Sequence, residues 1–289
     1  MPPETLLFAG PGSLLVSICA ALFGLLIGSF LNVVIYRIPK MNQREFDNYI
    51  AEESGKPLPH QDRFNLMVPR SACPCCGHQI TALENIPVVS YIALGGKCSA
   101  CKAHISLRYP AIELVSGVLS GLLVWHFGSG SMGLATLVFG YLLLAMTFID
   151  LDTMQLPDDM TLPLMWIGLL INTQAMFVPL EEAVIGAALG YLALWSVYQL
   201  FKLATGKEGM GYGDFKLLAA LGAWFGWTML PTIILVSSIL GAIVGVTQIL
   251  LGKHSFGKHM PFRPYLAVAG LVALFYGRPI AQFTQGFLG

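Results

Sequence analysis

Two aspartates stand beside apolar segments that are long enough to enter a membrane. Asp150 ends the apolar stretch 142–149, and Asp214 follows 211–213 and opens a second apolar segment. A carboxylate at the edge of hydrocarbon is costly to ionise, so such a residue is a functional hypothesis by default. Two of them indicate a pair that shares one proton and activates water, with either residue as the acid.

Simpler roles are open to the other acids near Asp150, and one is open to Asp214 as well. Asp158 and Asp159 follow a proline, where they can cap the next helix, and Asp152 is expected to be solvated in a turn. Asp150 lies closest to the apolar stretch and is the acid that we expect to be desolvated. Asp is also a common N-cap residue, so capping competes with catalysis as the role of Asp214.

The glycines that precede Asp214 suit the binding of a peptide. Gly209, Gly211 and Gly213 alternate with other residues, and glycine permits positive φ and close backbone approach. We therefore expect Gly211 and Gly213 to form an extended active-site loop that accepts a peptide and leads into a helix.

A set of four cysteines has the spacing of a zinc site. They form two C-x2-C pairs, which can supply four thiolates in tetrahedral array. The four are Cys73, Cys76, Cys98 and Cys101. Cys75 could replace one of the outer cysteines of its pair, and His78 is a weaker rival ligand, but C-x2-C geometry favours the outer two. Because four protein ligands leave no open position, we expect the zinc to hold the loop together without doing chemistry.

The elements that must position these residues have the composition of membrane helices. Of 289 residues, 55% are hydrophobic and 11% charged, with a mean hydropathy of +0.69, whereas soluble domains carry about 25% charged residues. No basic stripe suits nucleic acid, and the lipid bilayer is the expected surroundings. Eight apolar segments approach the roughly 20 residues that span a bilayer. Their expected limits are 12–36, 110–127, 132–149, 161–177, 183–201, 214–229, 231–251 and 264–279.

Basic residues predict the orientation of the chain. All 16 Lys and Arg residues except Arg278 lie on alternate connections of one side, and Lys and Arg favour the cytoplasmic side. The N-terminus is thus expected outside, with both aspartates at the cytoplasmic face. The cysteine loop is cytoplasmic too, and a reducing compartment disfavours disulfides there.

These expectations define an all-α polytopic membrane protein with about eight transmembrane helices and a small zinc-binding cytoplasmic loop domain. We expect a first transmembrane helix in 1–37, the zinc-binding domain in 38–109 and a helical membrane domain in 110–289. Within the loop, residues 41–63 are polar and are expected to be flexible.

The chain resembles the type IV prepilin peptidases, membrane aspartic proteases of the G-x-G-D group also described as leader peptidase/N-methyltransferases. The resemblance implies that Asp150 and Asp214 are the catalytic pair and that the outer four cysteines bind Zn2+. Cys75 departs from it, because we expect a charged or polar residue there in relatives. Besides the cysteine pairs, the matching segments are 28–33, 87–91, 95–98, 108–110, 113, 150–158 and 209–216.

The resemblance also implies a reaction sequence at the bacterial inner membrane, with the N-terminus periplasmic. Such enzymes cut the basic leader of type IV prepilins and type II secretion pseudopilins after a Gly on the cytoplasmic side. Many then methylate the new N-terminus with S-adenosylmethionine, and those tend to carry the long cysteine loop. No glycine-rich fingerprint marks a methyl-donor site. It could lie around Glu84, Gly95, Lys97 and Glu113, although ordinary loop and helix-end polarity explains these residues equally well.

Three alternatives remain open. The chain could be a peptidase without methyltransferase activity. It could be a proton-coupled transporter with Asp150 and Asp214 as a relay, although no internal repeat of the kind common in transporters is visible. It could also be a zinc-stabilised scaffold whose aspartates only cap helices.

Overall fold

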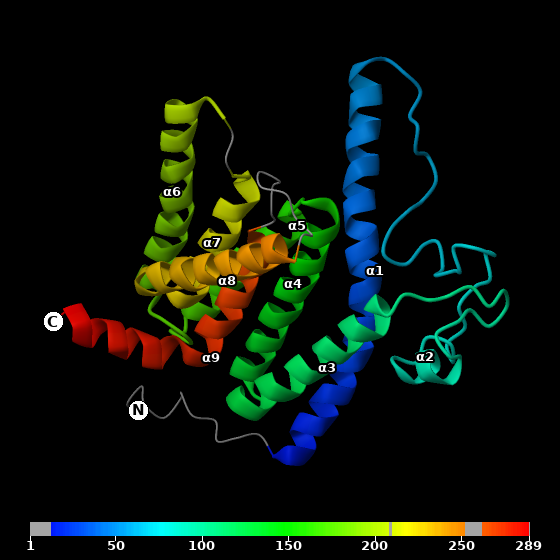
Figure 1. Ribbon diagram of the computed structural model, residues 1–289, viewed down its shortest axis with the longest axis horizontal. Coiled ribbons are helices and arrows are strands. Elements are labelled where there is room, and N and C mark those ends of the chain that lie inside the picture. The colour runs from blue at the N-terminus through cyan, green and yellow to red at the C-terminus, as the bar shows by residue number, and fades with distance from the viewer. Residues whose placement is uncertain (1–12, 208–209, 252–261, 289) are drawn as a thin grey trace. The chain divides into compact units, whose positions relative to one another are not determined.

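The computed structural model describes residues 13–207, 210–251 and 262–288, and no β-strand occurs among them (Figure 1). Each of the eight apolar segments expected from the sequence overlaps a helix, although 161–177 continues past the helix end at Asn172, and the all-α architecture is confirmed. The elements are α1 (Leu14–Glu53), α2 (Val89–Ala93), α3 (Arg108–Phe127), α4 (Ser131–Thr153), α5 (Asp158–Asn172), α6 (Leu180–Thr205), α7 (Tyr212–Phe225), η2 (Trp227–Met229), α8 (Leu230–Leu250) and α9 (Arg263–Leu288).

Five of the described helical stretches are long and apolar enough to cross a membrane, namely α1, α3, α4, α6 and η2 with α8. Helices α5 and α7 have only 15 and 14 residues, fewer than the roughly 17 that spanning requires. The apolar part of α9 described in full, Arg263–Gly277, is also short. The chain divides into two compact units between Ala145 and Met146, inside α4. We call the described residues up to Ala145 unit 1 and those from Met146 unit 2.

Helix α1 is longer than the sequence indicated. It runs for 40 residues through Pro39 to Glu53, so the expectation of flexibility from residue 41 is wrong as far as Glu53. Proline removes one helical hydrogen bond and usually marks a boundary, but the residues after it are good helix formers. Gln43 donates to Asp47 at 2.8 Å across one turn, the spacing at which helical side chains support one another.

Unit 1 is held together by close packing of α1 on α3. A Cβ on Gly28 would lie 2.6 Å from the Cα of Glu113, and a Cβ on Gly24 would collide with the hydroxyl of Ser120. Small residues let membrane helices approach closely, where packing and not the hydrophobic effect drives association. These two glycines therefore fix the contact between the helices.

Arg37 attaches the loop after α1 to that helix. Its side chain is buried, with Nη1 donating to the Asn65 carbonyl at 2.7 Å and Nη2 donating to the Pro69 carbonyl at 2.6 Å. Its guanidinium also lies 5.6 Å from the centre of the Phe64 ring. A planar fork of donors suits two neighbouring carbonyls, so this residue fixes the start of the cysteine loop.

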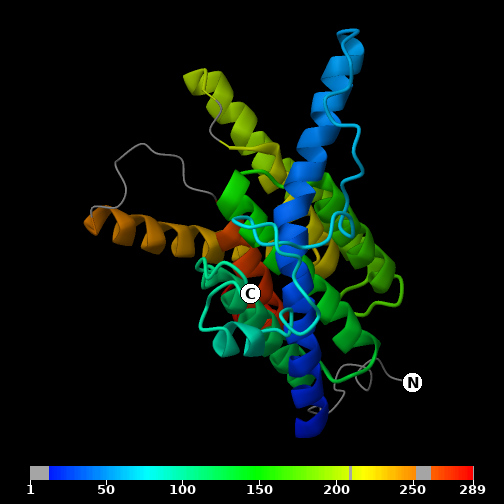
Figure 2. The same cartoon turned by 90° about the vertical axis from the view of Figure 1, so that its right-hand side faces the viewer.

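Unit 2 is built around α7. The helix packs against α5, α6 and α9, and Phe215, Leu218 and Trp224 are among its fully buried side chains. A helix that is apolar on all sides is either a core helix or lipid-facing, and burial makes this one a core helix. The buried position of α7 explains why it can be as short as 14 residues, because neighbouring helices surround it. Figure 2 shows α8, in orange, extending away from the other helices of this unit.

The C-terminal end of α7 is tied to the end of α5 by Asn172. The Asn172 Nδ2 donates to the carbonyls of Ala223 and Trp224 at 2.9 and 3.1 Å. Its Oδ1 accepts from the amides of Phe177 and Val178 at 3.0 and 3.2 Å. The last carbonyls of a helix have no partner within it, so this buried amide fixes α7 along its axis.

Candidate active site and metal site

Asp150 lies in the last turn of α4 and is fully buried. The prediction that it is the desolvated member of the local acids is confirmed. Its Oδ1 accepts a hydrogen bond from Arg263 Nη1 at 2.5 Å, whereas Oδ2 is buried without a hydrogen-bond partner. An unpaired buried carboxylate oxygen is costly, and such an oxygen is available to bind water or a substrate.

Asp214 lies in the first turn of α7 and is only 4% exposed. The N-cap residue of this helix is Gly211, so Asp214 is not the cap that the alternative interpretation required. Its Oδ2 lies 3.6 Å from Arg263 Nε, and its Oδ1 has no hydrogen-bond partner. An acid in the first turn is favoured by the helix dipole, which explains the location but not the burial.

Arg263 brings the two aspartates to one place. The guanidinium contacts Asp150 and Asp214 and also donates to the Met154 carbonyl at 2.8 Å. The two carboxylates come from helices separated by two others in the chain, yet one side chain contacts both. The arrangement can therefore act as a coupled pair, with one unpartnered oxygen on each member.

The glycines before Asp214 allow this close approach. A Cβ on Gly211 would lie 2.5 Å from Arg263 Nη2, and one on Gly213 would lie 3.0 Å from Nε. Gly211 is extended, with φ −89° and ψ 150°, but Gly213 already belongs to α7. Neither has positive φ, so the expected extended loop is shorter than predicted, and Gly209 lies outside the described residues.

The other acids of this edge have ordinary roles. Asp158 accepts from Lys216 Nζ at 2.7 Å with both oxygens, in a largely exposed ion pair. Pro157 is the N-cap of α5, so Asp158 and Asp159 stand in the first turn instead of capping the helix. Asp152 is exposed, as expected, although in the final turn of α4 and not in a loop.

The four predicted zinc ligands converge in unit 1. The sulfur atoms of Cys73, Cys76, Cys98 and Cys101 all lie within 4.8 Å of one another. The Cys73–Cys101 and Cys76–Cys98 sulfurs are 3.8 and 3.9 Å apart, close to the edge of about 3.8 Å that a tetrahedron with Zn–S bonds of about 2.3 Å requires. Cys75 is exposed and outside the cluster. The geometry fits a tetrahedral metal ion bound by the outer cysteines.

The two cysteine pairs have the same backbone form. The Cys73 amide donates to the His78 carbonyl, and the Cys73 carbonyl accepts from the Gly77 amide; Cys98 pairs with Ala103 and Lys102 in the same way. The closing residues Gly77 and Lys102 both have positive φ. Backbone amides lower the pKa of Cys73 to about 6, the Cys75 amide contributing most. A thiol prepared for deprotonation is what a metal ligand needs.

Glu84 connects the two cysteine pairs. It accepts from the amide and hydroxyl of Thr81 at 2.8 Å and lies 3.2 Å from His78 Nε2. His78 Nε2 in turn is 3.2 Å from the Ser99 hydroxyl, between the cysteines of the second pair. Hydrogen bonds from Ser99, Thr81 and His78 lower the pKa of Glu84 to about 2. This carboxylate supports the metal site and is already engaged there.

The other three residues considered for the methyl-donor site do not take part in the contacts of Glu84. Glu113 is buried on α3, where its Oε2 accepts from the Val88 amide at 2.8 Å. Gly95 and Lys97 are exposed beside the second cysteine pair, and Gly95 has positive φ with open space around it. Of the four residues considered for this site, Gly95 and Lys97 are therefore the two that are exposed and lie close together.

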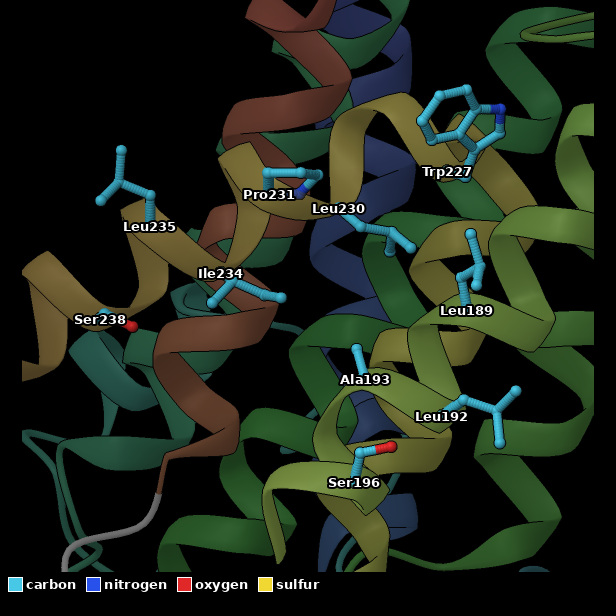
Figure 3. Close-up of a pocket in the computed structure, with 10 residues that line it drawn as sticks. All are labelled: Leu189, Leu192, Ala193, Ser196, Trp227, Leu230, Pro231, Ile234, Leu235 and Ser238. Carbon is cyan, nitrogen blue, oxygen red and sulfur yellow. The ribbon is translucent and has the colours of Figure 1, made fainter. Parts of the chain in front are cut away.

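A groove of about 740 Å3 lies in unit 2 between α6 and the start of α8 (Figure 3). Apolar side chains such as Leu189, Leu192 and Ile234 line it, and Ser196 and Ser238 are its polar residues. It contains no acid or base, so it has no means of hydrolysing a peptide. Such a surface suits hydrocarbon.

Sequence reasoning missed Arg263 as a partner of the aspartates and counted it only as a basic residue of the cytoplasmic side. One signal could have identified it. Two desolvated acids need a compensating cation, and Arg263 immediately precedes an apolar segment, as Asp214 does. The 113 positions that separate it from Asp150 hid the pairing.

Comparison with known protein families covers most of the chain. The family described as "Bacterial Peptidase A24 N-terminal domain" matches residues 22–127. The family described as "Type IV leader peptidase family" matches residues 137–246 and so includes both aspartates.

Several similar proteins are named prepilin leader peptidase/N-methyltransferase. The one from Stutzerimonas stutzeri is 54% identical over 289 residues, covering 100% of this chain and 98% of its own length. The one from Pseudomonas aeruginosa is 54% identical over 273 residues, 94% of each chain. The one from Aeromonas salmonicida is 54% identical over 266 residues, 91% of each chain. No solved structure matches the chain.

Proposed function

The chain belongs to the type IV leader peptidase family, and from this premise we propose that it is a membrane endopeptidase and N-methyltransferase of prepilins. It removes the basic leader after a Gly and then methylates the new N-terminal residue with S-adenosylmethionine. Type II secretion pseudopilins are its second substrate class. The domain limits proposed from the sequence, 1–37, 38–109 and 110–289, are kept, with α1 continuing into the second region.

The observation that carries the peptidase is the contact of one guanidinium with both Asp150 and Asp214. Hydrolysis by two carboxylates needs one ionised and one protonated member, and like charges close together favour this state. The ionised carboxylate takes a proton from water, and the protonated one donates a hydrogen bond to the scissile carbonyl. Each aspartate has an unpartnered oxygen that can serve these steps.

The proposed membrane location and orientation rest on the basic residues and on the helix ends that carry the aspartates. The chain lies in the inner membrane with the N-terminus periplasmic, and the zinc-binding domain and both aspartates face the cytoplasm. Support comes from the Lys and Arg residues, all but Arg278 on one side. The aspartates occupy the C-terminal turn of α4 and the N-terminal turn of α7, which are ends on that same side.

The metal is Zn2+, held by the outer four cysteines in a structural role. Four thiolates at tetrahedral spacing support zinc over a hard cation, which prefers oxygen ligands. When bound, the ion crosslinks the two cysteine pairs and supplies no chemistry to either reaction. For S-adenosylmethionine we propose the exposed surface at Gly95 and Lys97, because Glu84 and Glu113 already accept hydrogen bonds elsewhere.

Asparagine variants of the two aspartates test the peptidase. Asp150→Asn and Asp214→Asn should each reduce cleavage of a prepilin to the background level, because an amide neither ionises nor holds the shared proton. Asp159→Asn, on an exposed acid of the same edge, is the matched control and should cut normally. Normal cleavage by either variant of the pair would show that the assignment is wrong.

Mass spectrometry of the product formed by the wild type tests the second activity in the same assay. The processed N-terminus should carry one added methyl group when S-adenosylmethionine is present. A product that is cleaved but never methylated would show that the protein is a peptidase without methyltransferase activity.

A further inference from the structure

Arg263 occupies a position that the proposed hydrolysis does not use. It contacts Asp150 and Asp214, it donates to the Met154 carbonyl, and its side chain is only 14% exposed. It is also the first residue of α9. A cation is unfavourable at a helix N-terminus, where the dipole favours anions. The two carboxylates offset this unfavourable interaction with the helix dipole, so the position of Arg263 depends on them.

The space around the guanidinium is shaped for it. A side chain at Gly211 would collide with Nη2, and one at Gly213 would crowd Nε. Met154, which has positive φ, presents its carbonyl to Nη1. The guanidinium therefore has a defined site beside the pair and is not a mobile surface cation.

The charge of Arg263 conflicts with the state that hydrolysis needs. Two carboxylates alone hold one proton between them because both cannot ionise easily. A cation in contact with both removes that difficulty and favours the form in which both are ionised. In that form no carboxylic acid is present to polarise a carbonyl, so the arginine-bound pair is not yet able to act.

We propose that Arg263 is a positioning residue that sets the charge state of the aspartate pair. Bound to both carboxylates, it holds them ionised and in place. It withdraws from one of them when the pair takes up a single proton from solvent, and this proton is the one that the acid member uses in hydrolysis. The inference rests on the proposed function of the pair.

The remaining charges of this edge do not replace Arg263. Lys216 on α7 is engaged by Asp158 on α5 at 2.7 Å. Lys202 on α6 donates to the Tyr198 hydroxyl of the same helix at 3.2 Å. Besides the pair and Arg263, the charged groups on α4 to α7 and on the turn after α6, among the described residues, are Asp152, Asp158, Asp159, Glu181, Glu182, Lys202, Lys207 and Lys216. Glu181 and Glu182 lie in the first turn of α6.

The test is the pH dependence of kcat/KM for prepilin cleavage by the full-length enzyme in lipid vesicles, which reports on the free enzyme. Arg263→Gln removes the cation at similar length. Its alkaline limb should move to higher pH by about one to three units, the range over which a contacting charge acts. One unit above the wild-type limb, the variant should therefore exceed the wild type by about five- to tenfold.

Two further variants keep the test decisive. Arg263→Met is a second neutral replacement, and it carries the test if the glutamine variant does not accumulate. Lys216→Gln removes a cation from the same helix as Asp214 and is the matched control, whose limb should stay in place. If Arg263 only stabilised the fold, its replacement would lower stability without moving the alkaline limb.

The outcomes separate this inference from the proposed function. If Asp150→Asn or Asp214→Asn cuts normally, the proposed function fails whatever Arg263 does. If those variants are inactive but folded Arg263→Gln and Arg263→Met keep the wild-type limb, only the inference on Arg263 is overturned. Inactivity of both folded arginine variants at every pH would overturn it as well, because the pair should work without the cation.

Discussion

Replacing Asn172 by leucine should destabilise unit 2 through the end of α7. Leucine has the same number of side-chain heavy atoms and the same branching as asparagine, but it offers neither donors nor an acceptor. The Ala223 and Trp224 carbonyls would then lose the hydrogen bonds from the Asn172 amide in a buried place. The amides of Phe177 and Val178 would lose theirs as well, but these residues are half-buried and can reach water.

Two estimates of the cost agree. Leaving a buried polar group unsatisfied costs about 1–3 kcal/mol, so two carbonyls cost about 2–6 kcal/mol. Side-chain hydrogen bonds measured inside a membrane protein average about 0.6 kcal/mol, so four of them give about 2.4 kcal/mol. We therefore expect the free energy of unfolding to fall by about 2–4 kcal/mol.

Reversible unfolding in mixed micelles, followed by Trp fluorescence, measures this change. Trp224 reports directly, because its Nε1 donates to the Leu164 carbonyl at 2.8 Å inside the same core. Thr173→Val is the matched control. It removes an exposed hydroxyl that donates to the Leu170 carbonyl in the preceding turn, and it should cost less than about 0.5 kcal/mol. A cost for Asn172→Leu as small as that of the control would refute the reasoning.

Two further predictions concern the metal site. Cys98→Ser should abolish stoichiometric zinc in the purified protein, whereas Cys75→Ser should leave it unchanged, because only Cys98 belongs to the cluster; elemental analysis measures both, and zinc loss in the Cys75 variant would show that the ligand set is wrong. Glu84→Ala should weaken zinc binding by about 10–100-fold, the usual effect of removing a residue that supports the metal ligands, because Glu84 links Thr81 to His78. Competition with a chelator measures the affinity, and an unchanged affinity would contradict the linking role.

The parts that could be predicted from the sequence depend on nearby residues. The zinc ligands come as two pairs with the same short spacing, and a tight turn after each pair is enough to aim the sulfurs. The helices follow from the length of the apolar segments. Asp150 could be separated from its neighbouring acids because the apolar stretch ends at that residue.

The parts that could not be predicted depend on distant residues or on competing local signals. Hydropathy does not tell a core helix from a lipid-facing one, so the central place of α7 was hidden. The extension of α1 was missed because Pro39 resembles a boundary, whereas the helix continues through it to Glu53. Arg263 was missed because no local pattern links it to Asp150.

The burial of Arg37 has a consequence for how the protein is made. Under the proposed orientation, this is the first basic residue to follow the first apolar segment, so it helps to retain the segment's end in the cytoplasm while the chain is still unfolded. Once folded, the same guanidinium is enclosed by the carbonyls of Asn65 and Pro69. It is then no longer available to lipid headgroups. One side chain thus serves insertion first and architecture afterwards. A lysine would meet the first need but lacks the planar fork that the second requires.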